Sequence, residues 1–109
     1  MDFNGYQKKA KTTAIYPKDG NPLWYPALGL AGEAGEVADK VKKVMRDHAG
    51  VVTDENRKEL VNELGDVLWY MAMMAFELGV DLNDVAETNI RKITSRKQRG
   101  VIHGKGDDR

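Results

Sequence analysis

Four carboxylates form two matched pairs in the sequence, Glu33 with Glu36 and Glu63 with Asp66. The members of each pair are three residues apart, so both would project from one face of a helix. Carboxylates held this close repel one another, and the repulsion grows where the site is partly dry. A hard divalent cation with oxygen ligands relieves this repulsion, and Mg²⁺ or Mn²⁺ is the natural choice. The two pairs therefore predict a metal site.

The two pairs lie in an internal repeat with an offset of 30 residues, in which residues 30–38 align with residues 60–68. Either pair alone is typical of a solvated helix surface, since glutamate is a good helix former. Here, however, both pairs border an apolar stripe at the same position on the helical wheel. Each repeat also carries a mid-helix glycine, Gly35 or Gly65, which costs about 1 kcal/mol relative to alanine and suggests a close backbone approach. We expect two long antiparallel helices that face their acids toward each other.

A third polar group stands further along the chain. Asn89 falls within an apolar stripe, with Lys92 and Arg96 close to its edge; the stripe consists of Leu82, Val85, Ala86, Ile90 and Ile93. A buried amide beside a solvated basic flank would account for these residues without any function. The functional interpretation is a phosphate grip next to the metal, because arginine offers a fork of donors and lysine a point charge.

The elements that must position these residues are helices. Apolar periodicity and turn residues predict an all-α chain with helices over about 2–14, 26–48, 54–78 and 82–98. Thr53 or Asp54 is expected to cap the third helix, and Asp81 the fourth. Residues 1–99 are expected to form one helical domain. Residues 100–109 hold three glycines and no periodicity, so we expect an irregular tail.

Composition excludes several classes of protein. The chain has 17 Lys and Arg residues and 17 Asp and Glu residues, so it lacks the basic excess that would favour binding to nucleic acid. The chain has no cysteine, and no segment is apolar enough to span a membrane, so we expect a cytoplasmic protein. A chain of 109 residues buries a modest core, and oligomerisation is an expected source of further burial.

Taken together, these motifs resemble the MazG-like all-α nucleoside triphosphate pyrophosphohydrolases. The matching residues are Glu33-x-x-Glu36, then residues 37–62, then Glu63-x-x-Asp66, followed by Asn89-x-x-Lys92 and Arg96. The resemblance covers about residues 24–99. It implies a four- or five-helix fold, here expected as a four-helix bundle completed as a homodimer or homotetramer. It also implies Mg²⁺-dependent cleavage of (deoxy)nucleoside triphosphates between the α and β phosphates. Many members act as house-cleaning enzymes.

On this interpretation, all four carboxylates bind Mg²⁺, and either Glu33 or Glu36 also orients or deprotonates the attacking water. The residues expected to bind phosphates are Lys40, Lys92 and Arg96. Asn89 would position a phosphate or the sugar, Tyr70 would contact the sugar or base, and Trp24 would either stack on the base or anchor a loop. Two alternatives remain: a non-catalytic helical adaptor or regulatory subunit, and a metal buffer without nucleotide affinity.

Overall fold

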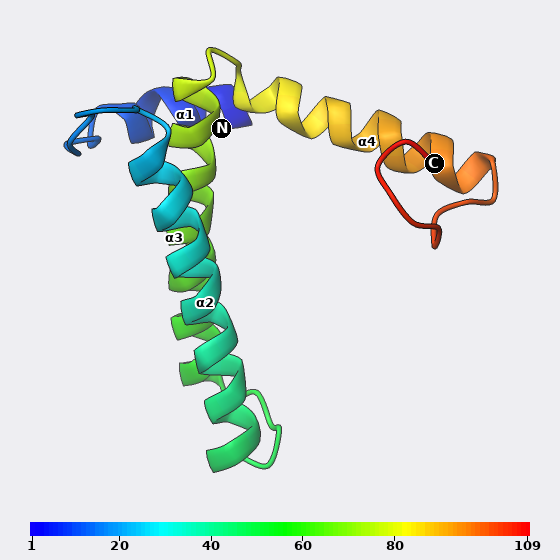
Figure 1. The fold of residues 1–109 in the computed structure, drawn as a ribbon. Helices are drawn as coiled ribbons and strands as arrows, with labels where there is room; N and C mark the ends of the chain where they lie inside the picture. The colour runs from blue at the N-terminus through cyan, green and yellow to red at the C-terminus, as the bar shows by residue number, and fades with distance from the viewer.

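The computed structural model describes residues 1–109 as four helices and no strand, which confirms the all-α fold class (Figure 1). The helices are α1 (Phe3–Lys11), α2 (Trp24–Asp47), α3 (Asp54–Glu77) and α4 (Leu82–Gln98). α1 ends earlier than predicted. The hydroxyls of Thr12 and Thr13 donate to the carbonyls of Lys9 and Ala10, and the chain tightens into a turn there.

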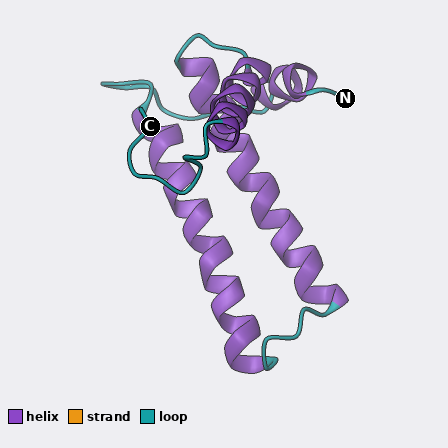
Figure 2. Cartoon of the chain, turned by 90° about the vertical axis from the view of Figure 1, so that its right-hand side faces the viewer, coloured by secondary structure: helices purple, strands orange, loops and turns teal.

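α2 and α3 lie side by side as an antiparallel hairpin, as the repeat predicted, with a short loop joining them at one end (Figure 2). α2 begins at Trp24, earlier than predicted, and Pro26 occupies its first turn, where an N–H would have no helical partner. At the start of α3, the side chain of Thr53 accepts a hydrogen bond from the amide of Asn56. The hairpin places the two carboxylate pairs at the same height along its long axis.

The core lies at the other end of the hairpin, where α1 and the start of α4 pack against α3. Its buried apolar residues are Ala10, Ala72, Met73, Ala75 and Leu82. Gln7 is buried beside them, and its amide nitrogen donates to the carbonyls of Ala72 and Val80, each at 3.2 Å. Its side-chain oxygen accepts from the amide of Leu82 at 3.1 Å. One side chain thus joins α1, α3 and α4 and helps to set the direction in which α4 leaves.

α4 extends away from the α2–α3 hairpin as an arm (Figure 1). It packs against α1 and α3 and makes no contact with α2. Leu82 is buried, but Ile90, which was predicted to lie on the buried side, is 58% exposed. The prediction of a continuous buried stripe on α4 is therefore wrong for a single chain, because no other helix faces the second half of the arm.

The hairpin also leaves part of its apolar stripe in solvent. Leu64 and Leu78 are each 56% exposed, whereas Val44 is buried. The predicted close backbone approach at Gly35 and Gly65 is wrong within one chain, since no atom lies within 4 Å of a Cβ built at either glycine. The Cα radius of gyration is 16.7 Å, compared with about 13 Å for a compact domain of about 100 residues. A single chain thus forms an open bundle. None of its helices combines the length and apolar character that crossing a membrane requires.

Candidate metal centre and adjoining pocket

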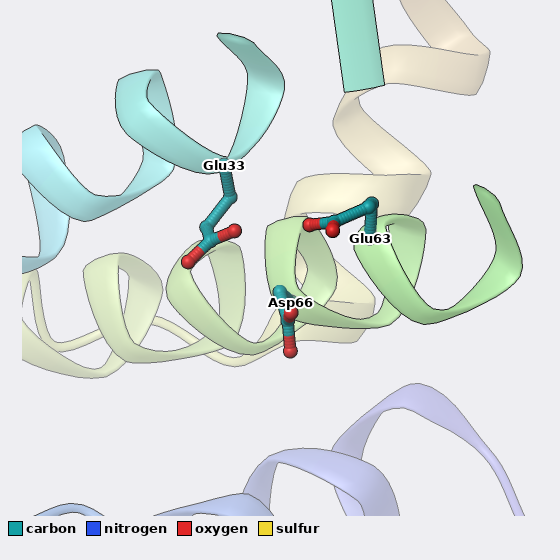
Figure 3. Close-up of side chains that lie close together, drawn as sticks. All are labelled: Glu33, Glu63 and Asp66. Atoms are coloured by element: carbon teal, nitrogen blue, oxygen red, sulfur yellow. The ribbon is translucent and has the colours of Figure 1, made fainter. Parts of the chain in front are cut away.

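Three of the four predicted carboxylates converge where α2 and α3 pack together. One carboxylate oxygen from each of Glu33, Glu63 and Asp66 lies within 4.8 Å of the other two. Glu33 projects from α2, and Glu63 and Asp66 project from α3 (Figure 3). The spacing of three residues on α3 places both of its acids on one face, and the antiparallel pairing sets Glu33 opposite them. We refer to these three residues as the acidic cluster.

The acidic cluster carries unbalanced negative charge. Partial burial of Glu33, together with the nearby carboxylates of Asp66 and Glu63, raises the pKa of Glu33 above its ordinary value. Lys40 offers limited compensation, because its Nζ lies 3.6 Å from Glu63 and 3.7 Å from Glu59 and so divides its charge between them. Oxygen ligands in excess of neutralising cations are the donor set that Mg²⁺ or Mn²⁺ prefers. The residues present therefore fit the divalent cation that the sequence predicted.

Glu36 does not join the acidic cluster. Its side chain is exposed, although its charge contributes to the raised pKa of Glu33. The sequence pattern treated the two repeats as equivalent, but α3 contributes two acids to the acidic cluster and α2 contributes one.

A pocket of about 350 Å³ opens beside the acidic cluster. It is lined by Thr13, Glu33, Asp66, Trp69 and Tyr70. This volume is at the lower end of the range for small-molecule sites, and the pocket combines acids at one side with aromatic rings at the other. Tyr70, predicted to contact the sugar or base, lies one turn beyond Asp66 and lines this pocket.

Tyr70 can occupy this wall because α2 has a glycine opposite it. A Cβ built on Gly29 would overlap Cε1 of Tyr70, far closer than van der Waals contact allows. Partial burial, then the neighbouring Tyr25, and the carboxylates of Glu33 and Asp66 raise the pKa of Tyr70, so its hydroxyl stays protonated. The role of Gly29 was not predicted, since its partner lies on another helix.

An aromatic cluster that the sequence did not predict holds the loop between α1 and α2 against α3. The rings of Tyr16 and Tyr25 stack with centroids 5.3 Å apart, and Tyr16 meets Trp69 edge-on at 6.2 Å. Trp69 in turn meets Tyr70 edge-on at 5.1 Å, and its indole N–H donates to the hydroxyl of Thr13 at 2.9 Å. Thr13 and Tyr16 both belong to the segment between α1 and α2, so this segment is tied to the pocket wall at two points.

Trp24, predicted either to stack on a base or to anchor a loop, is 61% exposed and does not line the pocket. Its ring lies beside Gly20, whose φ of +81° suits glycine; a Cβ built there would be 2.9 Å from the Trp24 ring. This position fits the anchor interpretation in a single chain.

The three polar residues of α4 lie apart from the acidic cluster in one chain. Asn89 is exposed beside a hollow that α1, α3 and α4 share. Lys92 and Arg96 follow it on the arm and bind a residue of the tail, Asp107, at 3.1 and 3.0 Å. The single chain does not bring this predicted phosphate grip next to the metal site.

Comparison with known proteins places these residues in a wider group. Residues 26–101 match the family described as the MazG nucleotide pyrophosphohydrolase domain. The chain is 53% identical over 114 aligned residues to the Gene 37 protein of Mycobacterium phage L5, across the whole of both chains. It is 36% identical over 72 residues to the uncharacterized protein YvdC of Bacillus subtilis (strain 168), covering 62% of this chain and 68% of that one. No solved structure matches the chain.

Proposed function

The chain belongs to the MazG nucleotide pyrophosphohydrolase domain family, and we propose that it is a Mg²⁺-dependent enzyme acting on (deoxy)nucleoside triphosphates. It hydrolyses the bond between the α and β phosphates and releases a nucleoside monophosphate and pyrophosphate, as a house-cleaning activity. The observation that supports this proposal best is the convergence of Glu33, Glu63 and Asp66 beside a pocket with an aromatic wall.

In this proposal the acidic cluster holds Mg²⁺, and Mn²⁺ can replace it because both ions prefer oxygen ligands. An ion held there would supply the positive charge that neutralises the triphosphate and stabilises the charge developing in the transition state. Glu36 is close enough to influence Glu33 but lies outside the cluster, so we assign to it the orientation of the attacking water. Glu33 remains the alternative for that role, together with its role as a ligand.

The pocket would receive the nucleoside part of the substrate. Tyr70 and Trp69 offer ring edges and faces to a sugar or base, and Thr13 closes the side toward α1. Lys40 stands on the opposite side of the acidic cluster, bound to Glu63 and Glu59, and is placed to contact phosphates once the cation screens Glu63. The chemistry of the pocket favours a planar aromatic ligand without selecting one base.

We further propose that the bundle closes by dimerisation and that α4 of one copy lies against the α2–α3 hairpin of another. Exposed apolar residues on the arm and on the hairpin, such as Ile90 and Leu64, would then be buried together. Charge supports the same pairing, since the end of α4 is basic and the metal centre is acidic. Asn89, Lys92 and Arg96 would thereby reach the phosphates bound at the partner's acidic cluster.

A panel of canonical and damaged nucleoside triphosphates, assayed for pyrophosphate release with and without Mg²⁺, tests the reaction. Glu63→Gln should lower kcat/KM by at least about a hundredfold, because it removes a metal ligand. Glu59→Gln is the matched control: Glu59 also pairs with Lys40 but lies outside the acidic cluster, and its loss should change kcat/KM less than threefold or so.

The alternatives predict different results from the same experiment. A helical adaptor or regulatory subunit would release no pyrophosphate from any nucleotide and would use its exposed apolar faces for another protein. A metal buffer would bind Mg²⁺ through the acidic cluster and show no affinity for nucleotides. Either result would contradict the proposed reaction.

A further inference from the structure

The C-terminal tail, residues 100–109, folds back along α4 instead of leaving it (Figure 1). Gly100 has a φ of +70°, and the amide of Val101 donates to the carbonyl of Arg96 at 2.9 Å, which reverses the chain. The guanidinium of Arg109 donates to the carbonyls of Val101, Ile102 and Gly106 and closes the tail into a loop. This closure returns residues 106–109 to the side of the arm.

The returning loop delivers one carboxylate to the two basic residues of the predicted phosphate grip. Oδ1 of Asp107 lies 3.1 Å from Nζ of Lys92 and 3.0 Å from a terminal nitrogen of Arg96, and that nitrogen also donates to the Asp107 carbonyl at 2.7 Å. The two cations hold the pKa of Asp107 below its ordinary value, so the carboxylate is charged at neutral pH.

The two sides of this contact differ in burial. The Arg96 side chain is only 7% exposed and its Nε has no hydrogen-bond partner, so the guanidinium keeps one donor unused while Asp107 is bound. The Asp107 side chain is 82% exposed. The Lys92–Asp107 pair is exposed on both sides and is therefore weak. The Asp107 carboxylate is thus the side of the contact that a dissolved anion can reach and replace.

We propose that Asp107 is an internal competitor for phosphate: its carboxylate occupies Lys92 and Arg96 in the free protein and is displaced when a polyphosphate binds. The tail thus acts as an autoinhibitory latch. This inference rests on the proposed function in assigning phosphates to Lys92 and Arg96. A phosphate chain offers more oxygens and more charge than one carboxylate, so it engages the arginine fork more completely.

Inorganic tripolyphosphate, titrated calorimetrically into the unmodified protein with Mg²⁺ present, tests the latch without requiring hydrolysis. Asp107→Asn should bind it about threefold to tenfold more tightly than the unmodified protein, the range expected when a weak exposed ion pair no longer competes. Asp108→Asn removes the same charge from the neighbouring position, where no ion pair is formed, and should change the affinity less than about twofold.

Hydrogen exchange of the tail supplies a second readout. Tripolyphosphate should speed amide exchange in residues 100–109 of the unmodified protein, because the tail is released. Equal affinities in the two variants, no detectable binding in any of them, or a tail whose exchange is unchanged or slowed would overturn the latch. If Asp107→Asn tightens binding while no nucleotide is hydrolysed, the latch stands and the proposed reaction fails.

Discussion

At the residue scale, the acidic cluster lowers the stability of the protein when no metal is bound. Three carboxylates meet between α2 and α3, and no cation lies among them apart from Lys40 at its edge. Folding therefore brings like charges together, and this opposes the pairing of the two helices. A cation that binds only the folded cluster reverses the sign of that contribution. Stability is thus a direct measure of whether the cluster is a metal site.

Glu33→Gln should raise the stability of the metal-free protein by a few tenths to about 1 kcal/mol, because it removes one charge from the cluster. The raised pKa of Glu33 gives the pH dependence. The folded state holds its proton to higher pH than the unfolded state, so the stability of the metal-free protein falls as pH rises from the ordinary value toward the raised one. Urea unfolding at several pH values measures both effects.

Mg²⁺ should act in the opposite direction. At 100 times its dissociation constant it should stabilise the unmodified protein by about 2.7 kcal/mol and Glu33→Gln by much less. Glu87→Gln, an exposed acid on α4, serves as the control and should leave both responses unchanged. If Glu33→Gln lost stability without metal, repulsion among the three carboxylates would not be what limits the stability of the metal-free protein.

Gly29→Ala should disturb the pocket wall. The new Cβ would overlap the ring of Tyr70, so the ring or the helix must shift, at a cost of about 1–3 kcal/mol. Gly32→Ala, in the same helix with no atom within 4 Å, should be neutral or stabilising by up to about 1 kcal/mol, the helix-propensity difference. Thermal unfolding of both variants, together with KM for a nucleotide substrate, distinguishes damage to the pocket wall from a change in helix propensity.

At the element scale, the sequence predicted those features of the fold that depend on local periodicity. The repeat around Glu33 and Glu63 predicted the helical hairpin, because in both helices the acids border the apolar stripe at the same position on the helical wheel. Periodicity did not predict the aromatic cluster, since Tyr16 contacts Tyr25 and Trp69 from a loop whose path depends on tertiary contacts. The only local signal of that loop was its turn residues, which predict that the chain bends but not where the loop packs.

Glu77 is the residue on which that loop depends most. Its carboxylate accepts from the Tyr16 hydroxyl at 2.7 Å and pairs with Lys18, also at 2.7 Å, while the Glu77 side chain is largely buried. Glu77→Gln should destabilise the protein by about 2 kcal/mol, the usual range for a hydrogen bond to a charged group. Glu87→Gln, which changes an exposed acid that makes no ion pair, should have almost no effect.

The pH dependence of this anchor follows from the lowered pKa of Glu77, for which Lys18 is the first cause. The stabilisation is fully present above the ordinary carboxyl pKa and is lost as pH falls through the lowered one. The difference in unfolding free energy between Glu77→Gln and the unmodified protein should therefore shrink in acid. A difference that persists unchanged at low pH would show that packing, and not charge, holds the loop.

At the scale of the whole molecule, one chain forms its four helices but leaves part of their apolar surface exposed to solvent. Local signals predicted the four helices, although α1 ends and α2 begins earlier than expected. The direction of α4 is instead set by the buried Gln7 and its contacts to Ala72, Val80 and Leu82. No periodicity encodes such a direction. The apolar stripe of α4 was therefore predicted correctly as a pattern and wrongly as a buried surface within the chain.

The open shape makes a quantitative prediction about self-association. If Ile90 packs against a second copy, Ile90→Asp removes about 1.5–3 kcal/mol of apolar burial and places a charge in the interface. The dimer dissociation constant should rise at least about tenfold. Thr88→Asp adds the same charge beside the stripe and should shift it far less. Light scattering across a dilution series measures both.

The same two variants connect assembly to activity. Because the proposed dimer brings Lys92 and Arg96 to the phosphates only across its interface, Ile90→Asp should lower pyrophosphate release in step with the fraction of monomer, and raising the protein concentration should restore it. Thr88→Asp should keep its activity on dilution. A monomer that retains full activity would show that the acidic cluster and its pocket work without α4 of a partner, and the arm would then need another role.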